Sequence, residues 1–134
     1  MNIYGIGTDI VSVDRIKVLL KNKNFIKRIF GHKEILKCKN LPNSMNCYAK
    51  RFAAKEAFSK ALGTGISNGI GFNEIIINNK KSGKPYIILI GKTKKLIEKR
   101  LKKKIFKVLL SISDEKKYAV AFVTISLWLK KKYP

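Results

Sequence analysis

Acidic residues are scarce in this sequence. Only 8 Asp and Glu stand against 30 Lys and Arg among 134 residues, which gives a formal net charge of +22. The imbalance indicates an anionic partner, such as nucleic acid, an acidic protein, a phosphorylated metabolite or a lipid headgroup. Lys outnumbers Arg by 26 to 4, a bias that AT-rich codon usage alone would produce. Charge by itself therefore does not choose among these partners.

Cysteine is rare as well. Cys38 and Cys47 are nine residues apart, without the spacing or the neighbours of a zinc knuckle. Two cysteines are also too few for a disulfide framework. We therefore expect two free thiols in a reducing cytoplasm.

Long apolar runs are missing too. The apolar stretch 118–129 has about twelve residues, whereas a helix needs about 20 to cross a bilayer. Residues 1–13 contain two glycines and an aspartate and have no basic leader, which is not typical of a signal peptide. We expect no membrane segment and a cytoplasmic location.

Apolar residues make up 46% of the chain and recur with regular periods, which predicts one folded domain over residues 1–134, with a basic tail at 130–134. Alternation predicts strands at 3–13, 72–78, 86–90, 106–113 and 118–126. Helical spacing predicts an interrupted helix over 14–30 and further helices at 34–39, 43–62 and 92–104. We expect an α+β fold in which the long helix packs on a small antiparallel sheet.

Two of the eight acids lie in structured, partly apolar segments. Asp9 shares one face of the first strand with Gly5 and Gly7, which would leave open space for a ligand or metal beside the carboxylate. Glu56 lies at the apolar border of the long helix, with Lys60 one turn further on. A surface Glu56–Lys60 ion pair and a hydrogen-bonded Asp9 are the structural alternatives. The functional alternative is a hard cation such as Mg²⁺ bound by both carboxylates.

Four groups of residues carry a family pattern: GIGTDIV (5–11), RFAAKEAFSKALGTGI (51–66), GKP (83–85), and SISD with YAVA (111–114 and 118–121). In order and spacing they resemble the holo-acyl-carrier-protein synthase family, the bacterial single-domain branch of the 4'-phosphopantetheinyl transferases. The likeness runs from about residue 3 to residue 125. The block at 51–66 is highly specific, whereas GKP alone would mean little.

The resemblance implies a 4'-phosphopantetheinyl transferase-like fold and Mg²⁺-dependent transfer of phosphopantetheine from coenzyme A to a serine of apo acyl carrier protein, in fatty acid biosynthesis. Adenosine 3',5'-bisphosphate would be the other product. Asp9 and Glu56 would hold Mg²⁺ on the coenzyme pyrophosphate, and Lys60 would neutralise phosphate charge. Further coenzyme contacts are implied at Arg51, Gly63, Gly65, Lys84 and Pro85. The resemblance also implies a homotrimer with active sites between protomers.

The general base is open at this point. Glu56 is the first candidate, and Glu34, which resembles an acid found after the first helical region in the family, is the second. Asp114 stands where many family members carry His, and an anion cannot donate to phosphate as an imidazolium would. His32 matches no functional position, so we expect a solvated or capping residue.

A docking surface for the carrier is expected on the first helical region. Carrier proteins of this class are acidic, and the region has a basic face interleaved with apolar residues, which suits steering and contact. The residues of this face are Arg15, Leu19, Lys21, Phe25 and Arg28. A merely solvated helix face is the alternative.

A basic RNA-binding or ribosome-associated protein is the competing functional class. The sequence has no recognisable RNA-binding signature, and that interpretation leaves Asp9 and Glu56 unexplained. A third possibility is a relative that binds the carrier without catalysing transfer. We expect the enzyme, with no nucleic-acid partner.

Overall fold

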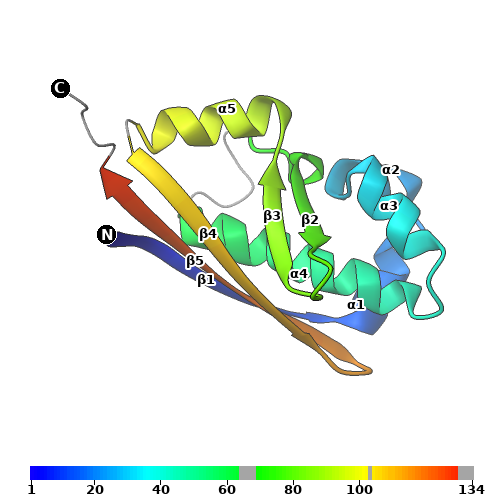
Figure 1. Cartoon of the computed structure of the whole chain (residues 1–134). Coiled ribbons are helices and arrows are strands. Elements are labelled where there is room, and N and C mark those ends of the chain that lie inside the picture. The colour runs from blue at the N-terminus through cyan, green and yellow to red at the C-terminus, as the bar shows by residue number, and fades with distance from the viewer. Residues whose placement is uncertain (64–68, 103, 130–134) are drawn as a thin grey trace.

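The computed structural model describes residues 1–63, 69–102 and 104–129 (Figure 1). Its elements follow in the order β1 (Asn2–Ser12), α1 (Val13–Leu19), α2 (Lys23–Ile29), α3 (His32–Lys39), α4 (Ser44–Leu62), the 3-10 helix η1 (Phe72–Glu74), β2 (Ile75–Asn79), β3 (Pro85–Leu89), α5 (Gly91–Arg100), β4 (Lys104–Asp114) and β5 (Tyr118–Leu129).

The three long strands form one antiparallel sheet in the order β1-β5-β4, and β2 and β3 form a separate antiparallel hairpin. Helix α4 lies along the sheet, and α1, α2 and α3 gather at one end of it (Figure 1). The expected α+β architecture, a long helix on a small antiparallel sheet, is confirmed. All the predicted elements are present, but the region 14–30 is two helices rather than one interrupted helix, and residues 72–74 form η1 rather than strand.

Helix α4 is buried on almost every side because the sheet, the hairpin and α3 surround it. Its alanines at positions 49, 53, 54, 57 and 61 are at most 4% exposed, and their small side chains allow close approach of the neighbouring elements. The helix ends at Gly63, whose φ of +79° favours glycine. The Gly63 N–H donates to the carbonyls of Ser59 and Lys60, so the predicted end of this helix is confirmed.

The glycines of β1 do not leave open space. A Cβ atom on Gly7 would overlap the carbonyl oxygen of Ala57, and one on Gly5 would overlap that of Ala61. The prediction of an open cavity beside Asp9 is therefore wrong. The missing side chains instead let the backbone of β1 lie directly against α4.

The expectation of two free thiols is also wrong. Cys38, near the end of α3, and Cys47, in the first turns of α4, form a disulfide with their Cα atoms 5.4 Å apart. Both residues are buried. The sequence separation did not indicate this pairing, because it depends on how the two helices pack.

Within the described ranges, no helix is long and apolar enough to cross a membrane. The basic tail predicted at 130–134 and Gly65 of the predicted coenzyme site lie outside the described residues.

Candidate active site

The centre of the site is an ion pair between a strand and a helix. The Lys60 ammonium of α4 donates to the Asp9 carboxylate of β1 at 3.1 Å and to the Thr8 carbonyl at 2.9 Å. The Asp9 side chain is 16% exposed and the Lys60 side chain 55%. Lys60 therefore pairs with Asp9 of the strand. The Glu56–Lys60 ion pair within α4, which helical spacing had offered as the structural alternative, is not the pair that forms.

Glu56 is half-buried and belongs to the same electrostatic group. Burial raises the pKa of its carboxyl, and the nearby Asp9 charge raises it further, while Lys60 and Arg15 oppose this shift. The two predicted carboxylates are thus close enough to repel each other. A bound cation would relieve that repulsion.

The donor set fits Mg²⁺ bound together with a phosphorylated ligand. Mg²⁺ typically takes one or two carboxylates, with phosphate oxygens and water completing its coordination. Asp9 and Glu56 supply two carboxylates, and the described part of the chain contains no group of three or more His, Cys, Asp or Glu that could hold a metal by itself. Such a site could hold a polyphosphate beside Lys60.

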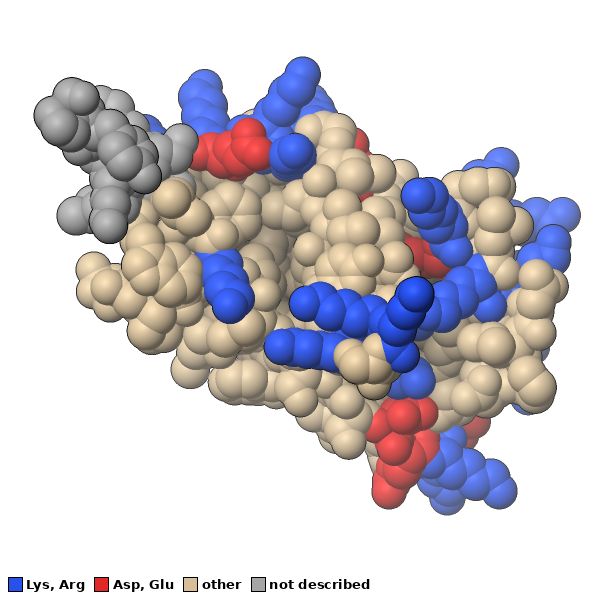
Figure 2. Space-filling model, in the orientation of Figure 1, with Lys and Arg blue, Asp and Glu red and all other residues tan. Residues whose placement is uncertain are grey.

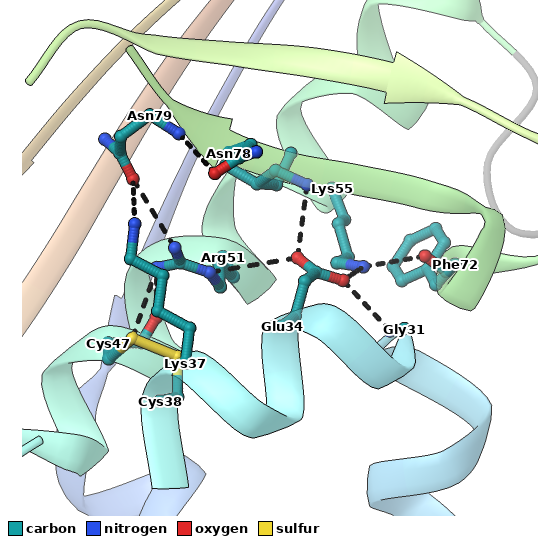
Figure 3. Close-up of polar contacts among 11 residues, drawn as sticks. Gly31, Glu34, Lys37, Cys38, Cys47, Arg51, Lys55, Phe72, Asn78 and Asn79 are labelled. Atoms are coloured by element: carbon teal, nitrogen blue, oxygen red, sulfur yellow. Dashed lines mark hydrogen bonds and ion pairs between the residues drawn. A yellow bond between two sulfur atoms is a disulfide. The ribbon is translucent and has the colours of Figure 1, made fainter. Parts of the chain in front are cut away.

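Arg51 is not part of this group. It lies five residues before Glu56 on α4, which is about 140° around a helix of 3.6 residues per turn, and its side chain is 5% exposed. Its guanidinium donates to the Cys47 carbonyl at 3.4 Å and contacts the Cys47 sulfur at 3.2 Å (Figure 3). Desolvation lowers its pKa, which the Glu34 charge opposes.

A second basic cluster surrounds Asn79, at the end of β2. The Asn79 side-chain oxygen accepts from Arg51 at 3.4 Å and from Lys37 at 3.2 Å, and its amide donates to the Gly83 carbonyl at 3.0 Å. This contact ties the turn containing Lys84 to the Arg51 side of the molecule. Lys and Arg side chains gather around this turn in Figure 2. Burial lowers the pKa of Lys37, and the Arg51 charge lowers it further.

Asp114 lies beside Lys50, whose charge acts on Lys37 of this cluster. Its carboxylate accepts from the Asn46 amide at 3.0 Å and lies 3.9 Å from the Lys50 ammonium. The sequence had left its contacts open. Lys37, Lys50 and Asn79 were missed as potential binding residues, because surface lysines and a strand-end asparagine carry no distinguishing signal in a chain with 26 lysines.

Comparison with known proteins agrees with this geometry. A sequence profile of the 4'-phosphopantetheinyl transferase superfamily matches residues 5–123. A holo-[acyl-carrier-protein] synthase of Pelagibacter ubique is 53% identical over 125 residues, covering 93% of this chain and 98% of the relative.

The chain belongs to the 4'-phosphopantetheinyl transferase superfamily.

Solved structures of holo-[acyl-carrier-protein] synthases have the same fold as this chain. The crystal structure of holo-[acyl-carrier-protein] synthase from Neisseria meningitidis matches with a TM-score of 0.84 and 42% identity, covering 93% of this chain and 99% of that one. A Bacillus anthracis synthase in complex with CoA (3',5'-ADP) matches with a TM-score of 0.74 and 38% identity, covering 92% and 96%. The predicted fold, family and enzyme class are confirmed.

Glu34 of the transferase cannot serve as the general base, so its candidacy is wrong. Its carboxyl is 1% exposed and lies 2.6 Å from the Lys55 ammonium, while its oxygens also accept from the backbone N–H groups of Gly31 and Ile77 (Figure 3). Burial lowers the pKa of Lys55 to about 8, although Glu34 opposes the shift. The pair joins α3, α4 and β2.

Four of the five residues expected on the carrier-docking face are at least partly exposed, and one is buried. Arg15, Lys21 and Arg28 are exposed and Leu19 is half-buried. Phe25 was expected to contact the carrier, but it is only 8% exposed. Its ring packs near those of Phe30 and Phe52, because the short α2 turns its apolar side toward α4.

Replacing Glu34 by Ala should lower the free energy of unfolding by about 3–5 kcal/mol, because Lys55 would remain buried without its partner. Urea denaturation followed by circular dichroism measures the loss. Glu98→Ala, at an exposed position of α5, is the control and should stay within about 0.5 kcal/mol of the parent. Equal stability of the two variants would show that the buried pair does not hold these elements together.

Proposed function

We propose that this protein transfers the 4'-phosphopantetheine group from coenzyme A to a serine of apo acyl carrier protein in an Mg²⁺-dependent reaction, releasing adenosine 3',5'-bisphosphate. We place this activity in fatty acid biosynthesis in the cytoplasm and assign it to a single domain over residues 1–134. The proposal depends chiefly on one observation: Asp9, Glu56 and Lys60 meet where β1 packs on α4, in a chain whose relatives are named holo-[acyl-carrier-protein] synthases.

Asp9 and Glu56 are the residues that would hold Mg²⁺. When bound, the cation supplies positive charge to the pyrophosphate of coenzyme A. Lys60 adds a second positive charge at the same place. Its contacts with Asp9 and the Thr8 carbonyl hold the ammonium beside the two carboxylates, while 55% of the side chain stays exposed to a ligand. Preorganised charge of this kind is the main contribution that proteins make to phosphoryl transfer.

Glu56 is our candidate for the general base. Its half-buried carboxylate lies in the same electrostatic group as Asp9 and Lys60, at the place assigned to the pyrophosphate. The proton would pass from the carrier serine to a Glu56 carboxylate oxygen, directly or through an ordered water. The serine oxygen would then attack the phosphorus on the pantetheine side of the pyrophosphate, and adenosine 3',5'-bisphosphate would leave.

The nucleotide end of coenzyme A is assigned to the second basic cluster. Arg51 is held there with its Nε 3.9 Å from the Glu34 carboxylate and without a hydrogen bond within the described chain, and Asn79 brings in the turn with Lys84 and Pro85. Gly63 and Gly65, which follow α4, are assigned to phosphate contacts of the coenzyme, since glycine amides can approach phosphate closely.

We also infer a homotrimer with active sites between protomers, and two features support this inference. The Arg51 cluster and the Asp9 group lie on different sides of α4, so one coenzyme could use both if they came from neighbouring chains. The sheet face away from α4 is also strongly apolar for an exposed surface. Its exposed side chains include Ile6 (62%), Ile10 (64%), Leu109 (44%) and Phe122 (46%), and neighbouring copies would cover them.

The carrier is assigned to the α1–α2 surface made by Arg15, Leu19, Lys21 and Arg28, with exposed Val18 (64%) taking the place of Phe25 as an apolar contact. An acidic carrier complements this basic face. Arg15 is also close enough to Glu56 to influence its pKa. A carrier bound at Arg15 would therefore bring its serine toward the proposed base.

The reaction itself is tested by incubating the protein with coenzyme A, Mg²⁺ and apo carrier, then weighing the carrier for one added phosphopantetheine. Asp9→Asn and Glu56→Gln keep the side-chain size but each removes one negative charge. We expect turnover to fall at least a hundredfold in each, equivalent to about 2.7 kcal/mol of transition-state stabilisation. Chelation of the metal should have a similar effect.

Excess Mn²⁺ should partly restore either variant, and Glu98→Gln on exposed α5 is the matched control. Normal turnover of Asp9→Asn and Glu56→Gln at limiting Mg²⁺ would make these carboxylates structural. No added mass with the parent protein would favour the RNA-binding or carrier-binding alternatives.

Arg15→Glu combined with Arg28→Glu should raise KM for the carrier by more than tenfold and change KM for coenzyme A much less, because this face is assigned to the carrier. Since the Arg15 charge also acts on Glu56, Arg28→Glu alone should leave KM for coenzyme A within about twofold. High salt should mimic the double variant. Arg100→Glu, on exposed α5, is the control. Equal loss of affinity for both substrates would remove the docking assignment.

Placing Glu at Phe122 should split the trimer, because three carboxylates would then be buried among apolar neighbours. Sedimentation velocity should give a single species near the monomer mass, and activity should be lost with assembly. Leu36→Glu, at a 49% exposed position on α3, should leave both unchanged. A fully active monomer would contradict the shared-site proposal.

A further inference from the structure

A groove lies between α2–α3 and the outward face of the β2–β3 hairpin, apart from the residues assigned to transfer. Its volume is about 620 Å³, and it is lined mainly by apolar side chains. Ile76 and Ile88 are directly paired across the two strands and line it together, with Ile90 beyond them. Phe30 and Ile35 form the helical side.

The rim of this groove carries two lysines and a histidine. Lys27 comes from α2, and His32 and Lys33 begin α3. All three are exposed, and none forms an ion pair in the described part of the chain. Unpaired lysines are common in this protein, so charge alone does not distinguish this groove from the rest of the surface. What distinguishes it is that three basic residues border an apolar groove.

Glu74 and Asn73, which also line the groove, already have hydrogen-bond partners. The Glu74 carboxylate accepts from the N–H groups of Lys92 and Thr93 at 3.1 and 3.2 Å and from the Thr93 hydroxyl at 2.9 Å, which directs it to the start of α5. The Asn73 amide donates to the Lys27 carbonyl at 3.3 Å. Lys27 and Lys33 therefore keep their positive charge available to a ligand.

We propose that this groove binds a small amphiphilic anion, specifically an alkyl carboxylate. Its chain lies on Ile76, Ile88 and Ile90, and its carboxylate meets the rim formed by Lys27, His32 and Lys33. The volume falls within the roughly 300–1,000 Å³ of small-molecule sites. Eleven residues line the groove, whereas a stable protein interface takes roughly 20–30 residues on each side, which favours the small ligand over a second protein.

Titration calorimetry of the full chain with decanoate, kept below the concentration at which it aggregates, tests the proposal. Decanol, which lacks the charge, should bind at least fivefold more weakly, and acetate, which lacks the chain, should show no binding. Added salt should weaken decanoate but not decanol. Equal binding of decanoate and decanol would overturn the assignment of the rim.

Two variants locate the site. Ile88→Glu places an acid among the apolar groove residues, and Lys33→Glu reverses a rim charge, so decanoate should bind at least tenfold and threefold more weakly, respectively. Their controls are Leu36→Glu and Lys95→Glu, which are exposed positions outside the groove and should leave the dissociation constant unchanged. Unchanged binding in both groove variants, or displacement of decanoate by apo carrier protein, would overturn the proposal.

This test is independent of the transferase assignment, since none of the substituted residues is given a role in transfer. Carrier modification should proceed normally in Ile88→Glu and Lys33→Glu. Failure of decanoate binding and failure of carrier modification can therefore be told apart.

Discussion

The close packing of β1 on α4 is the constraint on which the rest of this structure depends. Gly5 and Gly7 have no Cβ atoms that would overlap α4, and Ala57 and Ala61 leave its backbone accessible on that side. The strand and the helix consequently touch backbone to backbone. The expected open space beside Asp9 is therefore filled by α4. Because the facing residues are small, the Asp9 carboxylate of the strand comes within reach of the Lys60 ammonium of the helix.

A second set of interactions orders the opposite side of α4. Glu34, Lys55 and Arg51 are all nearly inaccessible, and a buried charge is tolerated only when its partners are in place. Glu34 meets this condition with Lys55 and two backbone N–H groups. The Cys38–Cys47 disulfide joins the same two helices beside Arg51. The basic cluster around Asn79 is therefore held in place by the buried Glu34–Lys55 pair and by the disulfide.

The large positive charge is not uniform in its consequences. Most lysines in the described part of the chain are exposed, and AT-rich codon usage alone would produce such a number. Three places combine cations with a second feature: the Asp9–Glu56 carboxylates beside Lys60, the Asn79 cluster around Arg51, and the apolar groove below Lys27 and Lys33. We propose a different class of anion for each of them, because the neighbouring groups differ even though the charge is the same.

The sequence by itself determined the element types, the α+β class, the end of α4 at Gly63 and the family, because these depend on local periodicity, on one left-handed glycine and on the specific block at 51–66. It also singled out Asp9, Glu56 and Lys60. Only the tertiary structure decided that Lys60 pairs with Asp9, that Glu34 and Phe25 are buried, and that Cys38 meets Cys47. Each of these depends on which faces of distant segments come together, and one-dimensional spacing does not contain that information.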